Sequence, residues 1–108
     1  MRIIIIAMCF YCLTSFYECT WYGNALHGNF TKSGEIFDKN KLTAASNKLP
    51  LNSIIKVTNK DNGKSVIVRI NDTGEMPKHV IDLSEKAFKQ IADLKTGRIK
   101  VKVKIIKW

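Results

Sequence analysis

Hydrophobic and polar positions alternate along much of this chain, and this alternation predicts short β-strands. The clearest case is the stretch 99–105, where an isoleucine or valine occupies every second position and a lysine each position between. Because successive side chains of a strand point to opposite faces, the pattern predicts one buried face and one row of lysines in water. Such a row also discourages edge-to-edge pairing between molecules.

A hairpin is predicted around the dipeptide Asn62-Gly63. Two runs rich in β-forming residues, 56–59 and 65–70, flank the polar stretch 60–64. Asn-Gly between two such runs is a strong hairpin signal, because both residues accept the positive φ of a tight turn. The two runs are therefore expected to pair with each other as antiparallel strands.

One short helix is predicted after Ser84. Serine is a good N-cap, Glu85 suits the first turn, and apolar residues recur at helical spacing at positions 83, 87, 91 and 94. Gly97 is expected to end this segment before the last strand. The sum is a mainly β domain with one short α-helix, and a closed barrel would leave none of its strand edges exposed.

The N-terminus carries a different pattern, which is typical of a secretory signal. Arg2 precedes an apolar run, 3–13, that is too short to span a bilayer comfortably. The alternative is a buried strand, because isoleucine has high β-propensity. We interpret residues 1–19 as an export segment and residues 20–108 as one folded domain. The mature protein is then expected to be secreted or periplasmic, without stable membrane insertion.

The cysteines and the net charge indicate which partners the protein could bind. A lipid attached to Cys19 could anchor the protein to a membrane, although the preceding residues are not the small ones that such processing requires. No cysteine pattern completes a zinc site, so neither metal nor cofactor is expected. The net charge of +9 indicates an anionic partner or surface. Nucleic acid is not expected, because the basic residues are scattered and the chain has an export signal.

Two aspartates follow predicted strands. Asp72 ends the run 66–72 before Thr73-Gly74, and Asp82 lies within 80–84. Carboxylates at strand ends suit proton chemistry on a polar polymer such as a glycan. For Asp72 the alternative is a turn residue, and for Asp82 it is a helix cap with Glu85 as capping-box partner.

Several motifs occur in the order seen in the rare lipoprotein A (RlpA-like) family, which the chain resembles over residues 20–108. The matching strings are Thr20-Trp21-Tyr22-Gly23, His27-Gly28, 31–38, 42–45, Leu49-Pro50, 57–59, Asn62-Gly63, 68–72 and 81–84. The resemblance implies a six-stranded double-psi β-barrel in a bacterial cell envelope. It also implies lytic transglycosylase activity on peptidoglycan, which some members of the family have. We expect the protein to act on peptidoglycan glycan strands as a monomer. A more distant resemblance is to expansins, which loosen walls without evident hydrolysis.

The resemblance also implies a mechanism. Endolytic cleavage of the MurNAc–GlcNAc bond with closure of a 1,6-anhydro ring needs a general acid that then acts as the base, so one carboxyl group suffices. Asp72 matches the catalytic aspartate of the family. Asp82 is its like-charge neighbour or the alternative acid. A general acid at neutral pH needs a raised pKa, through desolvation or a nearby negative charge.

Four further residues complete the predicted site. Tyr22 and His27 are expected to contact sugar, with packing and a surface role as their respective alternatives. Glu75 places a carboxylate where relatives carry proline in an Asp-Arg-Gly-Pro run. Ser46 occupies the position of a histidine thought to assist catalysis, and serine cannot shuttle protons at neutral pH. A non-catalytic peptidoglycan-binding or wall-loosening module is therefore the alternative function.

Overall fold

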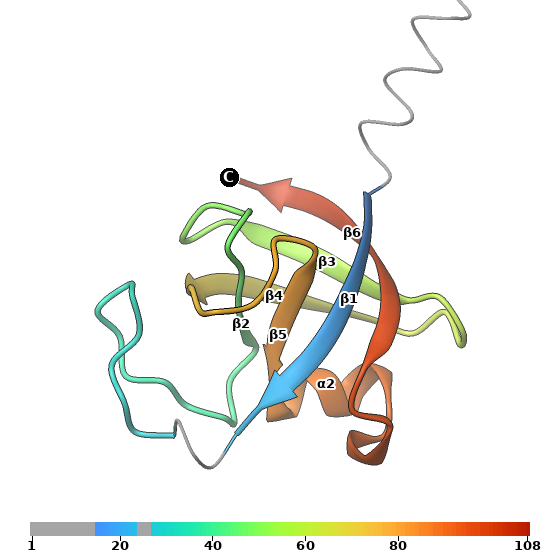
Figure 1. The fold of residues 1–108 in the computed structure, drawn as a ribbon, viewed down its shortest axis with the longest axis horizontal. Coiled ribbons are helices and arrows are strands. Elements are labelled where there is room, and N and C mark those ends of the chain that lie inside the picture. Colours follow the sequence, from blue (N-terminus) through green and yellow to red (C-terminus); the bar gives the residue numbers. More distant parts are fainter. Residues whose placement is uncertain (1–14, 24–26) are drawn as a thin grey trace, which may run out of the picture.

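Six strands form a closed barrel in the computed structural model, which describes residues 15–23 and 27–108. Around the barrel the strands follow the order β1-β5-β2-β4-β3-β6 (Figure 1). Their bounds are β1 Ser15–Tyr22, β2 Thr43–Ala45, β3 Ile54–Asn59, β4 Ser65–Asp72, β5 Val80–Ser84 and β6 Ile99–Lys107. The predicted six-stranded barrel is confirmed.

Two of the strand pairs are parallel and bring distant segments together. Strands β1 and β5 pair in parallel, as do β2 and β4, whereas the remaining neighbours are antiparallel. Parallel pairing requires a crossover connection, because a tight turn cannot return the chain in the same direction. As a result, the carboxyl ends of β2 and β4 meet at the same edge of the barrel.

The barrel interior is filled by the apolar set that the alternation predicts. On β6, Ile99, Val101 and Val103 are buried while the lysines between them are exposed. The predicted hairpin is also present, as β3 pairs with β4 through a turn in which Gly63 has a φ of 74°. The alternation therefore predicted the buried face of β6, and the Asn62-Gly63 turn predicted the pairing of β3 with β4.

The helix is shorter than predicted. Ser84 caps α2, Glu85–Ile91, by accepting a hydrogen bond from the Ala87 amide. A separate 3₁₀ turn, η1, occupies Leu94–Thr96 and ends at Gly97. The side chain of Asp93 accepts a hydrogen bond from the Lys95 amide and so starts this second turn. Capping by the aspartate therefore divides the predicted segment in two.

Strand β1 begins before the domain boundary expected at Thr20. It starts at Ser15, and Tyr17 and Cys19 are only 5% and 0% exposed. Burial, together with the charge of Asp82, raises the pKa of the Cys19 thiol. A lipid on this sulfur would not fit the core, so the structure argues against an anchor there. The apolar run 3–13 lies outside the described residues, and the export segment stays a prediction.

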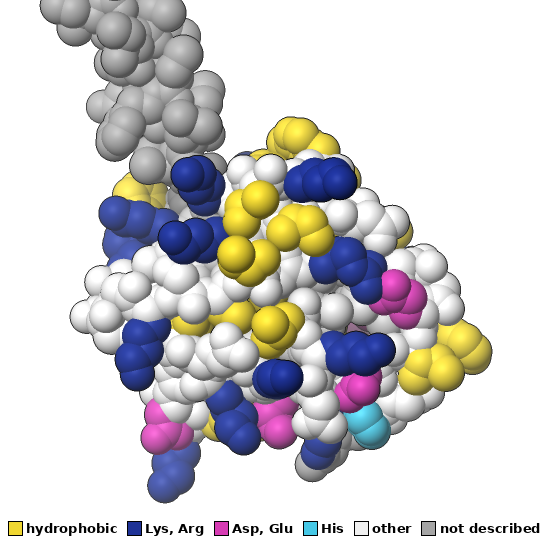
Figure 2. Space-filling view, turned by 180° about the vertical axis from the view of Figure 1, so that it is seen from behind, with side chains coloured by type: hydrophobic (Ala, Val, Ile, Leu, Met, Phe, Trp, Pro, Cys, Tyr) yellow, Lys and Arg dark blue, Asp and Glu magenta, His cyan; other side chains and the backbone are white. Residues whose placement is uncertain are grey.

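Positive charge is spread over the surface. Figure 2 shows lysine and arginine side chains dispersed across one face of the molecule, with hydrophobic side chains among them. Within the described part of the chain, no helix is long and apolar enough to cross a membrane.

Candidate functional site

A cavity of about 280 Å³ lies where β4 and β5 flank the short strand β2. Asp72 and Asp82 both line it, together with Tyr22, Ala45 and the loop 73–76. Ala45 pairs with Asp72 on one side and with Asp82 on the other. Neighbouring strands lie about 4.8 Å apart, so β2 separates the two aspartates by roughly two strand spacings. The fold therefore brings together the two carboxylates that the sequence singled out.

Asp82 is a half-buried carboxylate on the outer face of the barrel. Its two neighbours on β5 are fully buried, so the alternation of the strand turns Asp82 outward. Thr20 Oγ1 donates a hydrogen bond of 2.7 Å to Asp82 Oδ1. Burial raises the pKa of Asp82, while the Thr20 hydrogen bond and the charge of Arg98 act to lower it. The helix-cap interpretation of Asp82 is wrong, because Ser84 caps the helix.

Asp72 is the last residue of β4, and two backbone amides fix its carboxylate. Thr73 N and Lys32 N donate to Asp72 Oδ1 at 2.9 and 3.0 Å. Its backbone carbonyl accepts a further hydrogen bond from Ser46 N at 3.0 Å. Asp72 therefore caps the turn and also lines the cavity, so the turn-residue and cavity interpretations apply together.

The loop 73–76, which carries Glu75, is held against the barrel by Asn47. Asn47 Nδ2 donates to the carbonyls of Gly74 and Met76 at 2.7 and 2.6 Å. Its Oδ1 accepts a hydrogen bond of 3.0 Å from Gly74 N. Sequence reasoning missed this residue, because an asparagine after a short strand has many possible roles. Glu75 lines the cavity from this loop.

Tyr22 presents a neutral phenol to the cavity. Its ring stacks on Phe37, with centroids 4.5 Å apart and 24° between the ring planes. Its hydroxyl is buried and has no hydrogen-bond partner among the described residues. Burial first, and then the charges of Asp72 and Asp82, raise the pKa of this hydroxyl. Tyr22 therefore stays protonated and can donate a hydrogen bond to a ligand.

Two predicted residues do not line the cavity. Ser46 is 1% exposed, and its Oγ accepts hydrogen bonds from Lys48 N and Leu49 N at 3.1 and 3.0 Å. This hydroxyl stabilises a turn behind Asp72 and gives no support to a contact with substrate. His27 lies on the long loop, where its Nδ1 accepts a hydrogen bond from Lys39 N at 3.2 Å.

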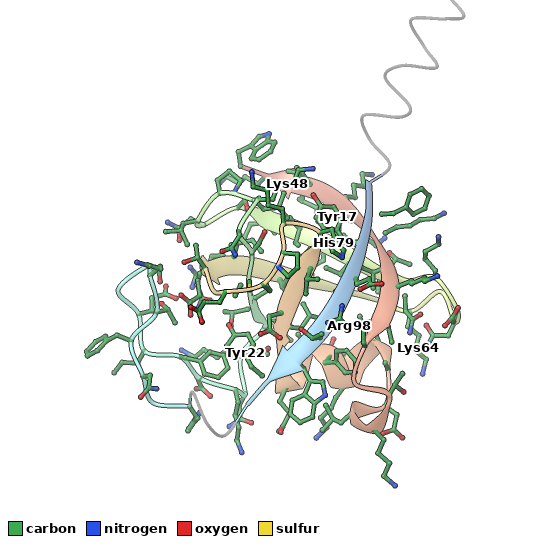
Figure 3. The ribbon with its side chains drawn as sticks, viewed as in Figure 1. Tyr17, Tyr22, Lys48, Lys64, His79 and Arg98 are labelled. Atoms are coloured by element: carbon green, nitrogen blue, oxygen red, sulfur yellow. The ribbon has the colours of Figure 1, made fainter. Side chains whose placement is uncertain are left out.

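A separate hollow of about 430 Å³ lies along Tyr17, Lys48 and His79. In Figure 3 these three residues group together, away from Tyr22, which is the last residue of β1. This second place offers aromatic and basic groups but no carboxylate among its lining residues. Across residues 15–23 and 27–108, no cluster of three or more histidine, cysteine or acidic residues is placed to hold a metal ion. The cavity of Asp72 and Asp82 is therefore the candidate active site.

Comparison with known proteins gives the family. A family model described as lytic transglycolase matches residues 17–103. The "Endolytic peptidoglycan transglycosylase RlpA" of Vibrio cholerae is 45% identical over 92 residues, covering 82% of this chain and 34% of the relative. The protein of the same name from Pseudomonas aeruginosa is 51% identical over 85 residues, covering 78% and 25%. The chain thus spans about a third or less of the length of these relatives.

A solved structure agrees on the fold. An expansin of Clavibacter michiganensis, solved as a variant in complex with cellohexaose, superposes with a TM-score of 0.69. It is 19% identical to this chain, and the match covers 88% of this chain and 51% of the expansin. The chain therefore belongs to the lytic transglycolase family and is an RlpA-like double-psi β-barrel.

Proposed function

We propose that this chain cleaves peptidoglycan glycan strands as an endolytic transglycosylase, with Asp72 as the general acid and base. The observation that carries the proposal is the shared cavity of Asp72 and Asp82, on either side of Ala45. The printed names of the relatives supply the polymer and the reaction. The cavity supplies a carboxyl group that can do proton chemistry on it.

In the proposed reaction, Asp72 first gives its proton to the glycosidic oxygen between MurNAc and GlcNAc. The bond from C1 to that oxygen breaks, and the 6-hydroxyl of the same muramyl ring attacks C1. Asp72 then takes the hydroxyl proton as the 1,6-anhydro ring closes, so no water is consumed. The amides of Lys32 and Thr73 support this role, because they hold the carboxylate in one orientation.

Asp82 and Tyr22 take the supporting roles. Because burial raises its pKa, Asp82 keeps a proton to higher pH than an exposed aspartate does. It can therefore donate a hydrogen bond into the cavity at mildly acidic pH. The neutral phenol of Tyr22 offers a second donor beside the sugar.

We also propose that the protein works in the cell envelope as a monomer. Peptidoglycan lies outside the cytoplasm, and the apolar run 3–13 suits export. A signal of this kind would have to be cleaved before Ser15, because the barrel begins there with β1.

The decisive experiment incubates the protein with peptide-free glycan strands and searches for anhydro-muramyl ends by mass spectrometry. Asp72→Asn is expected to lower the rate by about a hundredfold or more, as loss of acid–base assistance does. Asp82→Asn should retain more activity and change the pH profile. Asp61→Asn, which removes an exposed carboxylate elsewhere, is the matched control. If Asp72→Asn stays active while Asp82→Asn is inactive, Asp82 is the acid and the assignment is wrong.

One observation favours a second function, glycan binding without cleavage. The hydroxyl of Ser46 bonds two amides of its own turn, so it gives Asp72 no proton-shuttling partner. A binding module would co-sediment with sacculi and produce no anhydro ends. Because the chain carries a net charge of +9, that binding should weaken as salt is added.

A further inference from the structure

A third cavity, of about 320 Å³, is lined by residues next to those of the candidate active site. Thr43 precedes Ala45 by two positions on β2, and Asn71 directly precedes Asp72 on β4. Thr43 and Asn71 are only 5% and 2% exposed. Neither Thr43 Oγ1 nor Asn71 Oδ1 has a hydrogen-bond partner within the described residues. Buried polar atoms without partners are rare and costly, so a ligand that supplies partners here is favoured.

The orientation of the Asn71 amide decides what that ligand must offer. Asn71 Nδ2 donates to Glu35 Oε1 at 3.2 Å, which leaves Oδ1 as the unpartnered atom. Arg69 holds Glu35 in place through two hydrogen bonds of 2.6 Å. The Arg69 hydrogen bond is also the main reason that the pKa of Glu35 is lowered. Glu35 thus stays an acceptor, and Asn71 Oδ1 needs an N–H or O–H donor from outside.

Charge around the cavity is balanced. The carboxylates of Glu35 and Asp38 and the cations of Lys41 and Arg69 all line it, so the cavity has no net charge that would favour a bare metal cation. An anion is disfavoured by the unpartnered acceptor of Asn71 and by the carboxylate of Glu35. A neutral group that carries both a donor and an acceptor fits best. Ile36, 59% exposed, adds an apolar surface to the same cavity.

We propose that this cavity binds the acetamido group of an N-acetylated amino sugar. The acetamido N–H would donate to Asn71 Oδ1, and the Thr43 hydroxyl would donate to the acetamido carbonyl. The methyl group would pack against Ile36. The inference rests on the proposed function, because it names the kind of sugar that is held beside the cleavage cavity.

The test titrates the ¹⁵N-labelled protein with two uncharged probes and follows the backbone amide signals by NMR. Chitotetraose carries acetamido groups, whereas cellotetraose has hydroxyls in their place. Chitotetraose is expected to shift signals of residues 35–43 and 69–71. Thr43→Val should weaken its binding about two- to tenfold, the effect of losing one hydrogen bond. Thr43→Ser should restore the affinity, and Ile36→Ala, at an exposed position, should weaken it without a folding defect.

Thr58→Val, on β3, is the matched control, and it should bind chitotetraose like the parent protein. Equal shifts with cellotetraose would show a site for any sugar and overturn the proposal. So would the absence of shifts in residues 35–43 and 69–71, which would mean that the cavity holds only water. The two proposals fail separately, because these probes report binding and the anhydro-muramyl assay reports cleavage. A protein that cleaves glycan but ignores chitotetraose at this cavity refutes only the acetamido site.

Discussion

Replacing Asn47 with alanine is expected to release the loop that forms one wall of the active-site cavity. The side chain of Asn47 makes three hydrogen bonds to the backbone of this loop, two to Gly74 and one to Met76. The loop carries Glu75 into the cavity that Asp72 lines. Alanine at position 47 removes all three bonds without adding bulk.

The expected loss of stability follows from the number of these hydrogen bonds and from their exposure to water. Each neutral hydrogen bond contributes about 0.5–1.5 kcal/mol to stability. Asn47 is only half-buried, so water replaces part of what is lost. We expect Asn47→Ala to lower the free energy of unfolding by about 1–3 kcal/mol. In a domain of this size each kcal/mol corresponds to roughly 4–8 °C in Tm.

Two measurements check this prediction at different scales. Calorimetry gives the change in Tm, and hydrogen exchange at the Gly74 amide reports the loop itself, because that amide donates to Asn47 Oδ1. Exchange at Gly74 should accelerate in the variant while the barrel strands stay protected. Asn40→Ala, at an exposed asparagine, is the control and should change neither quantity. Unchanged exchange at Gly74, with a Tm within about one degree of the parent, would refute the proposed anchoring.

Three further results are expected. Asp82→Asn should raise Tm at neutral pH, because a raised folded-state pKa means that ionisation of this carboxyl opposes folding. Thermal scans should show this gain shrinking as pH falls through the raised pKa toward the ordinary aspartate value, below which it should be absent, and a constant gain would contradict the prediction. Ser46→Ala should lower the free energy of unfolding in urea by about 1–3 kcal/mol, because it leaves the buried Leu49 amide without its hydrogen bond. A change near zero would show that the turn does not need this hydroxyl. Peptide mapping after iodoacetamide treatment should find Cys19 unmodified in the native protein and modified after guanidinium unfolding, whereas native labelling would place the thiol outside the core.

Local patterns predicted the strands and their faces. The alternation in 99–105 and the Asn62-Gly63 turn each depend on neighbours in the chain, and both predictions are confirmed. The helix was predicted too long, because a helical spacing of apolar residues continues past Ile91 while Asp93 starts a new turn. Strand β1 begins before the expected boundary at Thr20, and its pairing with β5 and β6 buries Tyr17 and Cys19, which no local pattern predicts.

The sequence by itself determined the barrel class, the family resemblance and the two carboxylates, since strand periodicity and ordered motifs are properties of the chain alone. Only the tertiary structure decided that Asp72 and Asp82 face one cavity, because both lie beside Ala45 through pairings between distant strands. It also placed Ser46 in a turn and left the oxygens of Thr43 and Asn71 without partners. Burial and hydrogen-bond satisfaction depend on segments far apart in the chain, so no local pattern encodes them.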